Sequence, residues 1–269
     1  MKRNVVLTII LFLSVIGVRA QLNCTFTHYT QENGLSQNTI MDMIQDSDGL
    51  IWFATWNGIN RFDGYEFKIY KAHKDNDSQW SSNRVEKLEM DSHGNIWCVS
   101  YDGRAFRFDK RQEAFHEIKP QGNIDFIADR IVALKNSSVW LLSPENGAVR
   151  VTGNSVTFEN YGKVNNVFLD SRQHEWVLTD DGLRCIDAKT NKQSTYFATN
   201  KKTKAVDKQN FLSAVEADEK IYFGSDKGRI WVNDIKTGEF TMHTIDANDE
   251  VFYMESLKNG IATLDRNLA

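Results

Sequence analysis

The side chains most able to carry chemistry are scattered along this chain of 269 residues. None of its 36 acids forms a pair in a distinctive setting, although glycoside hydrolysis needs two placed carboxylates. The six histidines show neither an HExxH motif nor another metal-ligand spacing. No GxSxG turn and no phosphate-binding loop occurs. We therefore predict no catalytic residue, no metal site and no cofactor, and we expect the chain not to be an enzyme.

One group of residues suits ligand binding. Trp56 and Tyr101 occupy equivalent positions in two related turns, and Asn57 and Asp102 follow them directly. An aromatic ring beside an amide or a carboxylate can stack on a sugar ring and hydrogen-bond its hydroxyl groups. Trp80, in a polar loop, has similar character. We predict these five as ligand-binding residues; the alternative is that they are ordinary exposed turn residues.

These turns belong to an internal repeat. Its aromatic residues stand 45, 43, 36 and 46 residues apart, at Trp52, Trp97, Trp140, Trp176 and Tyr222. A serine or threonine follows each of them by three residues. A glycine follows four of them by six residues and Trp140 by seven. Such regularity indicates a repeat architecture, and it favours a packing role for the five aromatic residues.

Each unit has the pattern of four short strands joined by Asp, Asn and Gly turns. The second strand is apolar at nearly every position, so both of its faces should be covered. Stacked four-stranded sheets provide such cover, and the repeat length fits a β-propeller. We predict an all-β fold, a propeller of four-stranded antiparallel blades over residues 21–269. The expected blades are residues 38–70, 83–118, 129–160, 163–197, 210–243 and, in part, 250–269.

Two units depart from the pattern. The third has Lys135, Asn136, Ser137 and Ser138 in place of the Asp-x-x-Gly turn, and the fourth has Glu175 where the others have Ile or Val. The chain carries five complete repeats plus a partial sixth. Because open sheet edges invite unwanted pairing, a propeller closes its ring. We therefore interpret the chain as a truncated or incomplete ring.

The N-terminus has the layout of a secretory signal peptide over residues 1–20. Lys2 and Arg3 precede an apolar run at 5–18, which is short for a membrane span, and a small-x-Ala site ends at Ala20. We expect cleavage near Ala20 and a periplasmic location. Removal of residues 1–20 would change the net charge from −4 to −7, and no basic stripe indicates nucleic acid as a partner.

The first unit resembles the two-component regulator propeller repeat, a family with the pattern D-x-x-G-x-[IL]-W-x-[GA]-T-x-x-G-[LI]-x-R-[FY]-[DN]-G. The resemblance rests on Gly34-Leu35-Ser36-Gln37-Asn38 and on the run from Ile44 through Trp52 and Gly58 to Gly64. It implies the periplasmic sensor of a hybrid two-component system, with oligosaccharides as common ligands. In a full-length sensor it also implies a homodimer, a membrane segment and a histidine kinase, and we expect no kinase region within this chain.

Three further expectations remain. The stretch 26–30, just before the first unit, reads as a strand and should be the outer strand of the last blade. A free-standing extracytoplasmic propeller that binds protein partners is an alternative to sugar sensing. A sialidase-like hydrolase is a weaker alternative, because Asp46 and Asp91 stand one residue too early for the Ser-x-Asp-x-Gly-x-x-Trp turn.

Overall fold

The computed structural model describes residues 25–71, 82–122, 124–197, 209–226, 228–245, 250–251, 253–257 and 260–264. These residues form five four-stranded antiparallel sheets and one two-stranded sheet. The helical structure within them is a single 3-10 turn, η1 (Gln31–Asn33), and no helix there is long and apolar enough to cross a membrane. The predicted signal peptide at 1–20 lies outside the described residues.

The strands follow the predicted four-strand plan. Blade 1 contains β1 (Ile40–Gln45), β2 (Ile51–Thr55), β3 (Gly58–Phe62) and β4 (Phe67–Tyr70), and blade 2 contains β5 (Val85–Met90), β6 (Ile96–Ser100), β7 (Ala105–Asp109) and β8 (Ala114–Glu117). Blade 3 contains β9 (Arg130–Ala133), β10 (Ser138–Leu142), β11 (Ala148–Thr152) and β12 (Ser155–Glu159), and blade 4 contains β13 (Val164–Leu169), β14 (His174–Thr179), β15 (Gly182–Asp187) and β16 (Gln193–Tyr196). Blade 5 contains β17 (Phe211–Ala217), β18 (Lys220–Ser225), β19 (Arg229–Asp234) and β20 (Phe240–Thr244), and blade 6 shows β21 (Tyr253–Leu257) and β22 (Gly260–Leu264).

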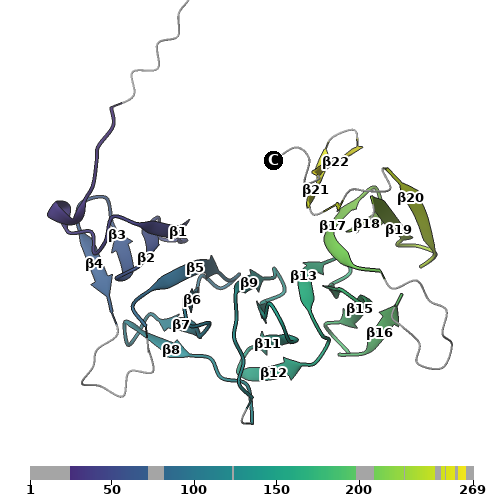
Figure 1. Cartoon of the computed structure of the whole chain (residues 1–269), viewed down its shortest axis with the longest axis horizontal. Coiled ribbons are helices and arrows are strands. Elements are labelled where there is room, and N and C mark those ends of the chain that lie inside the picture. Colours follow the sequence, from purple (N-terminus) through teal and green to yellow (C-terminus); the bar gives the residue numbers. More distant parts are fainter. Residues whose placement is uncertain are drawn as a thin grey trace, which may run out of the picture.

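The blades stand side by side along an arc (Figure 1). The first strand of each blade lies on the inner side of the arc and the fourth strand lies on the outer side. The arc is open between β1 and the β21–β22 pair. The prediction of an all-β propeller with an incomplete ring is therefore confirmed.

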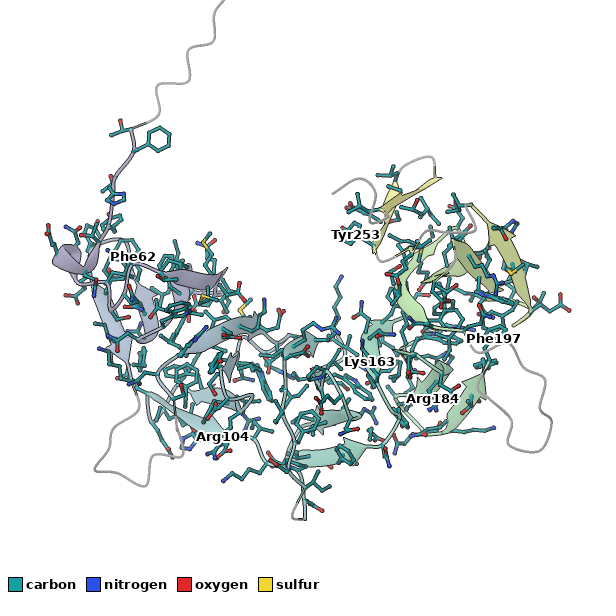
Figure 2. The ribbon with its side chains drawn as sticks, viewed as in Figure 1. Phe62, Arg104, Lys163, Arg184, Phe197 and Tyr253 are labelled. Carbon is teal, nitrogen blue, oxygen red and sulfur yellow. The ribbon has the colours of Figure 1, made fainter. Side chains whose placement is uncertain are left out.

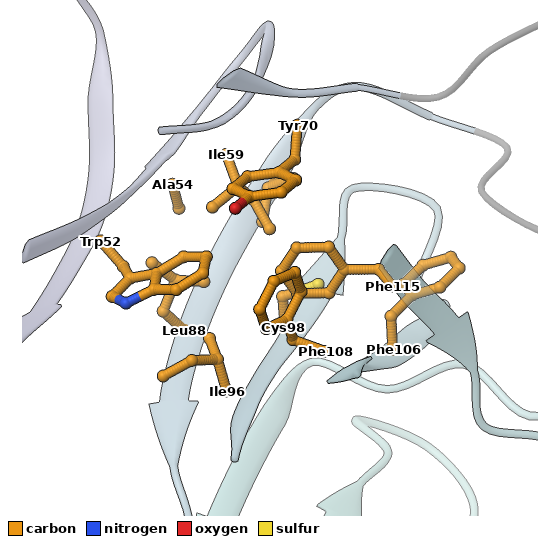
Figure 3. Packing of buried hydrophobic residues seen from close by; sticks show 11 residues of the cluster. Trp52, Ala54, Ile59, Tyr70, Leu88, Ile96, Cys98, Phe106, Phe108 and Phe115 are labelled. Atoms are coloured by element: carbon orange, nitrogen blue, oxygen red, sulfur yellow. The ribbon is translucent and has the colours of Figure 1, made fainter. Parts of the chain in front are cut away.

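The hydrophobic core is divided among the seams between consecutive blades. At the first seam Trp52, Ile59 and Tyr70 of blade 1 pack against Phe106 and Phe108 of blade 2 (Figure 3). Every residue of β6 and β10 is buried, as expected for strands covered on both faces. Burial of this apolar surface holds the blades together, at about 25 cal/mol per Å².

The repeated aromatic residues are packing residues in four of the five units. Trp52, Trp97, Trp140 and Trp176 are all fully buried, each facing the next blade along the arc. Tyr222 differs, because it is only half-buried. The next sheet along the arc in the described part of the chain is the two-stranded β21–β22, which offers less cover than a four-stranded blade.

The aspartates in the turns between the first and second strands of blades 1, 2 and 4 also hydrogen-bond the buried tryptophans. Each carboxylate accepts a hydrogen bond from the indole Nε1 of its own blade: Asp46 from Trp52 (2.8 Å), Asp91 from Trp97 (2.9 Å) and Asp170 from Trp176 (3.1 Å). The same carboxylates accept backbone N–H groups of the turn. The Asp-x-x-Gly signature is therefore turn chemistry that also satisfies a buried indole.

The two departures from the repeat compensate each other across the seam between blades 3 and 4. Leu134 stands at the position of those aspartates, so the turn of blade 3 offers Trp140 no carboxylate. Its indole donates instead to Glu175 of the next blade, at 3.0 Å. Glu175 is fully buried and forms an ion pair with Arg150 at 2.9 Å. It also accepts hydrogen bonds from the side chains of Asn136 and Ser138.

Gly58 and Gly147 of the repeat lie at or just before the start of the third strand of their blades and pack against the end of the fourth strand. Gly58 and Gly147 have left-handed φ angles of 108° and 67°. A Cβ atom on either would lie 2.4 Å from a backbone oxygen, that of Tyr70 or of Glu159. A side chain would therefore block the connection that leaves the fourth strand, which explains the glycine column in the sequence.

The segment before blade 1 does not form a strand among the described residues. Phe26 is 91% exposed, while Tyr29 packs edge-on against Phe62 and Phe67 of blade 1. A strand requires a partner, and residues 25–30 pair with none of the described strands. That this segment forms the outer strand of a last blade stays a prediction.

Candidate functional site

The turns between the second and third strands of all blades point to the same end of the propeller, because every blade is an antiparallel meander in the same order. Trp56 lies in the β2–β3 turn and Tyr101 in the β6–β7 turn. Their side chains are 45% and 61% exposed, unlike the buried tryptophans of the seams. Turn positions on an end face are the common place for binding residues on a rigid scaffold.

Arg84 joins the two aromatic residues into one group. Its guanidinium carbon lies 4.2 Å from the ring centroid of Trp56 and 4.0 Å from that of Tyr101. A guanidinium over an aromatic face is attracted by the ring quadrupole. The Tyr101 amide also donates to the Arg84 carbonyl oxygen at 2.8 Å. We name Trp56, Arg84 and Tyr101 the aromatic clamp.

The sequence did not indicate Arg84. It lies just before the strand β5, outside the turns that carry the repeat signature. Arg84 contacts both Trp56 of blade 1 and Tyr101 of blade 2 only because the two blades are stacked. The signal available in the sequence was its position directly before the first apolar strand of a unit.

The two polar residues of the predicted set have different roles. The Asn57 side chain donates to the Ser36 carbonyl oxygen at 3.1 Å and ties the β2–β3 turn to the segment before blade 1. Asp102 accepts a hydrogen bond from Ser100 Oγ at 2.5 Å and lies 3.7 Å from the Arg104 guanidinium. Asn57 therefore holds the turn that carries Trp56, while the side chain of Asp102 interacts with Ser100 and Arg104 and not with the clamp. Trp80 lies outside the described residues.

Asp102 forms one side of a pocket of about 430 Å³. The pocket lies between the β6–β7 turn, the end of β8 and the connection that follows β8. Its charged residues are Asp102, Arg104, Glu117, Lys119 and Asp125. Arg104 projects beside β8 on the outer side of blade 2 (Figure 2). We name this the blade 2 pocket; because Asp102 follows Tyr101 directly, it adjoins the aromatic clamp.

The described residues offer little to metal or thiol chemistry. They contain no group of three or more His, Cys, Asp or Glu side chains that could hold a metal ion. Burial raises the pKa of the Cys98 thiol, and it raises the pKa of the Cys185 thiol to about 12. Both thiols are therefore protonated at neutral pH, so neither is an activated nucleophile.

Comparison with known proteins shows what this propeller is similar to. Residues 34–57 match the family model described as two component regulator propeller, so the chain carries a repeat of that kind. A segment of 72 residues, 26% of the chain, is 43% identical to histidine kinase P4 of Formosa agariphila. This segment spans 5% of the length of that kinase.

Two solved structures from B. thetaiotaomicron have the same fold. The extracellular domain of BT4673, assigned to a one component system, has a TM-score of 0.57 at 20% identity over 85% of this chain. The extracellular domain of BT3049, assigned to a hybrid two component system, has a TM-score of 0.54 at 19% identity over 90% of this chain. The chain covers 34% and 36% of those two proteins.

Proposed function

We propose that this chain is the exported, ligand-sensing propeller of a two-component sensor and that its ligand is an oligosaccharide. The aromatic clamp carries the proposal. Trp56 and Tyr101 are large, exposed rings on one end face, next to a pocket with hydrogen-bonding groups. Such a combination binds a sugar by stacking on its ring and by hydrogen-bonding its hydroxyl groups. The likeness to a histidine kinase and to extracellular domains supports the sensor class.

In this proposal the chain has no catalytic activity of its own. Of the three carboxylates in the blade 2 pocket, Asp102 lies beside Arg104, Glu117 contacts both Arg104 and Lys119, and Asp125 lies in the connection after β8. The ligand would be bound and released unchanged.

The proposed mechanism is a ligand-biased equilibrium. Sugar bound to the propeller face would favour one arrangement of a homodimer, and the membrane segment of a longer sensor would transmit that arrangement to its kinase. Binding shifts such a balance only through different affinities for the two arrangements. In this mechanism the propeller binds the sugar with different affinity in the two dimer arrangements. It would do so in the periplasm, after cleavage of the signal peptide near Ala20.

A thermal-shift screen of the chain against oligosaccharides tests the proposal. A ligand that binds the native state stabilises it, by about 2.7 kcal/mol at a concentration one hundred times its Kd. We expect one class of oligosaccharide to raise the melting temperature by several degrees. A cooperative melt that no oligosaccharide shifts would contradict sugar sensing, and binding of a protein partner instead would identify a scaffold propeller.

A further inference from the structure

An arginine of the third strand lies over the buried tryptophan in each of the first three seams. The guanidinium carbons lie 5.8, 5.6 and 5.7 Å from the ring centroids, for the pairs Arg61–Trp52, Arg107–Trp97 and Arg150–Trp140. In two seams the strand 3–4 turn of the following blade supplies an acceptor to this arginine. Glu113 lies 3.6 Å from Arg61, and the Asn191 side chain accepts a hydrogen bond from Arg150 at 2.8 Å.

The seam between blades 2 and 3 lacks this acceptor. The strand 3–4 turn of blade 3 has two residues, Gly153 and Asn154, whereas residues 110–113 form the longer turn that carries Glu113. A Cβ atom on Gly153 would meet nothing within 4 Å. Among the described residues, no carboxylate lies within ion-pair distance of Arg107. The short turn therefore leaves open the place that Glu113 fills between blades 1 and 2.

A cavity of about 620 Å³ lies beside Arg107, within the usual range for small-ligand sites. Lys110 and Arg111 line it from the β7–β8 turn. His116 lines it as the cross-strand partner of Arg107, the position that Lys68 has beside Arg61 in blade 1. We name this the seam 2 cavity.

The acids at the seam 2 cavity are already engaged by other groups. Asp109 lines the cavity and accepts two backbone amides of its own turn, at 2.7 and 3.1 Å, which hold its pKa below the ordinary value. Asp48 pairs with Lys110 at 3.3 Å. Asp91 does not line the cavity, and its carboxylate accepts four N–H groups, one of them the Trp97 indole.

Two guanidinium groups therefore remain available to an anion from solution. Arg111, like Arg107, has no carboxylate within ion-pair distance in the part of the chain that the structure describes. A guanidinium group binds a carboxylate through two parallel N–H donors. The ring of His116 can add a third donor. The arrangement matches the one that receives the Glu113 carboxylate between blades 1 and 2.

We propose that the seam 2 cavity binds the carboxylate of a small acidic ligand through Arg107 and Arg111. The cavity lies at the β7–β8 turn, and the aromatic clamp lies at the strand 2–3 turns, which are at the opposite end of an antiparallel meander. The proposal is therefore independent of sugar binding at the clamp, and it adds a second ligand site to the propeller.

Titration calorimetry at constant ionic strength tests the proposal. The probes are succinate and glucuronate, with glucose as the uncharged counterpart of glucuronate. Succinate has no sugar ring, so the two acids distinguish a simple dicarboxylate from a sugar acid as the source of the carboxylate. We expect at least one acid to bind about tenfold or more tightly than glucose. Binding of neither acid would overturn the proposal and leave sugar sensing at the clamp intact.

Variants of the two arginines locate the binding. Arg107→Gln and Arg111→Gln each remove one guanidinium group, and we expect each to weaken binding of the acid about tenfold, as typical for a hydrogen bond to a charged group. Arg111 is an exposed turn residue, so its variant leaves the packing of the seam unchanged. Arg130→Gln is the matched control, because Arg130 is exposed, pairs with Asp129 and lies outside the cavity. Native affinity in both cavity variants would overturn the proposal.

Discussion

Glu175 is a fully buried acid at the seam between blades 3 and 4. It is a buried acid in a strand whose counterparts carry Ile or Val, and it serves a tryptophan of the preceding blade. Both departures were visible in the sequence as separate irregularities. Their connection was not predictable, because Leu134 and Glu175 are 41 positions apart and meet only when blades 3 and 4 stack.

Replacement of Glu175 by alanine should destabilise the fold strongly. The change leaves the Arg150 guanidinium buried without its carboxylate, which costs about 3–5 kcal/mol. Denaturant unfolding measures this difference. Glu145→Ala, in an exposed turn of blade 3, is the control and should stay within about 0.5 kcal/mol of the native chain.

A double variant tests the cause of that loss. Glu175→Ala with Arg150→Leu removes both charges, so no unpaired ion remains in the seam. We expect the double variant to be more stable than Glu175→Ala alone. Equal or lower stability would show that the hydrogen bonds of Glu175 to Asn136, Ser138 and Trp140, rather than the ion pair, are decisive.

The candidate site was predictable in part at the residue level. The common turn position of Trp56 and Tyr101 selected two exposed aromatic residues correctly as surface features, whereas the role of any of these residues in ligand binding stays a prediction. Arg84, Glu117 and Lys119 were missed. Arg84 and Lys119 lie in connections between strands and Glu117 lies at the end of β8, where the repeat pattern gives no positional signal.

At the scale of elements, the turn glycines determine how closely one blade follows another. Gly147 and Gly153 lie in the same blade with similar φ angles of 67° and 59°. A Cβ atom on Gly147 would lie 2.4 Å from the Glu159 carbonyl oxygen, while one on Gly153 would meet nothing within 4 Å. The pair therefore separates backbone strain from steric overlap.

Gly147→Ala should destabilise the chain more than Gly153→Ala. Both variants force alanine into the left-handed region, at about 1–2 kcal/mol. Gly147→Ala also has to displace the backbone at the end of β12, which adds about 1–3 kcal/mol. Equal unfolding free energies for the two variants, measured in denaturant, would show that the connection moves freely and would contradict this role for the glycine.

Asp91, in the turn between β5 and β6, makes stability depend on pH. Burial opposes ionisation of Asp91, but hydrogen bonds from Asn95, Trp97 and turn amides outweigh it and hold its pKa below the ordinary value. The native state then binds the proton less readily than the unfolded state. The resulting stability is present above the unfolded pKa of about 4 and is lost as the pH falls below it.

Asp91→Asn tests this dependence. At pH 7 the variant should be less stable than the native chain, because it lacks the charged acceptor. Since acid removes the same contribution from the native chain, the difference in melting temperature should shrink between pH 5 and pH 3. A difference that stays constant over this range would contradict the role of the Asp91 charge.

At the scale of the whole molecule, the fold was predictable from sequence to a large extent. The aromatic, hydroxyl and glycine columns predicted stacked four-stranded blades, because each column marks a fixed point of the meander. Tyr222 shows the limit of this reasoning. Its position in the repeat predicted burial, but burial depends on how much of the next blade covers it.

The open arc predicts a gradient of local stability. Blades 2, 3 and 4 are packed on both sides, whereas the described part of blade 1 meets another blade on one side only (Figure 1). In a stacked array, stability depends on contacts with neighbours. Hydrogen exchange should be slowest in β6, β10 and β14 and faster in β1 and in β21–β22. Equal protection of blades 1 and 3 would contradict an open arc.

The most direct test of the account is the affinity of the aromatic clamp for the oligosaccharide that the thermal screen selects. Titration calorimetry would compare the native chain with Trp56→Ala, Tyr101→Ala and Tyr65→Ala, where Tyr65 is 93% exposed in a strand 3–4 turn at the opposite end. The account predicts at least about tenfold weaker binding for both clamp variants, as for central aromatic contacts, and native affinity for Tyr65→Ala. Native affinity in both clamp variants would contradict it.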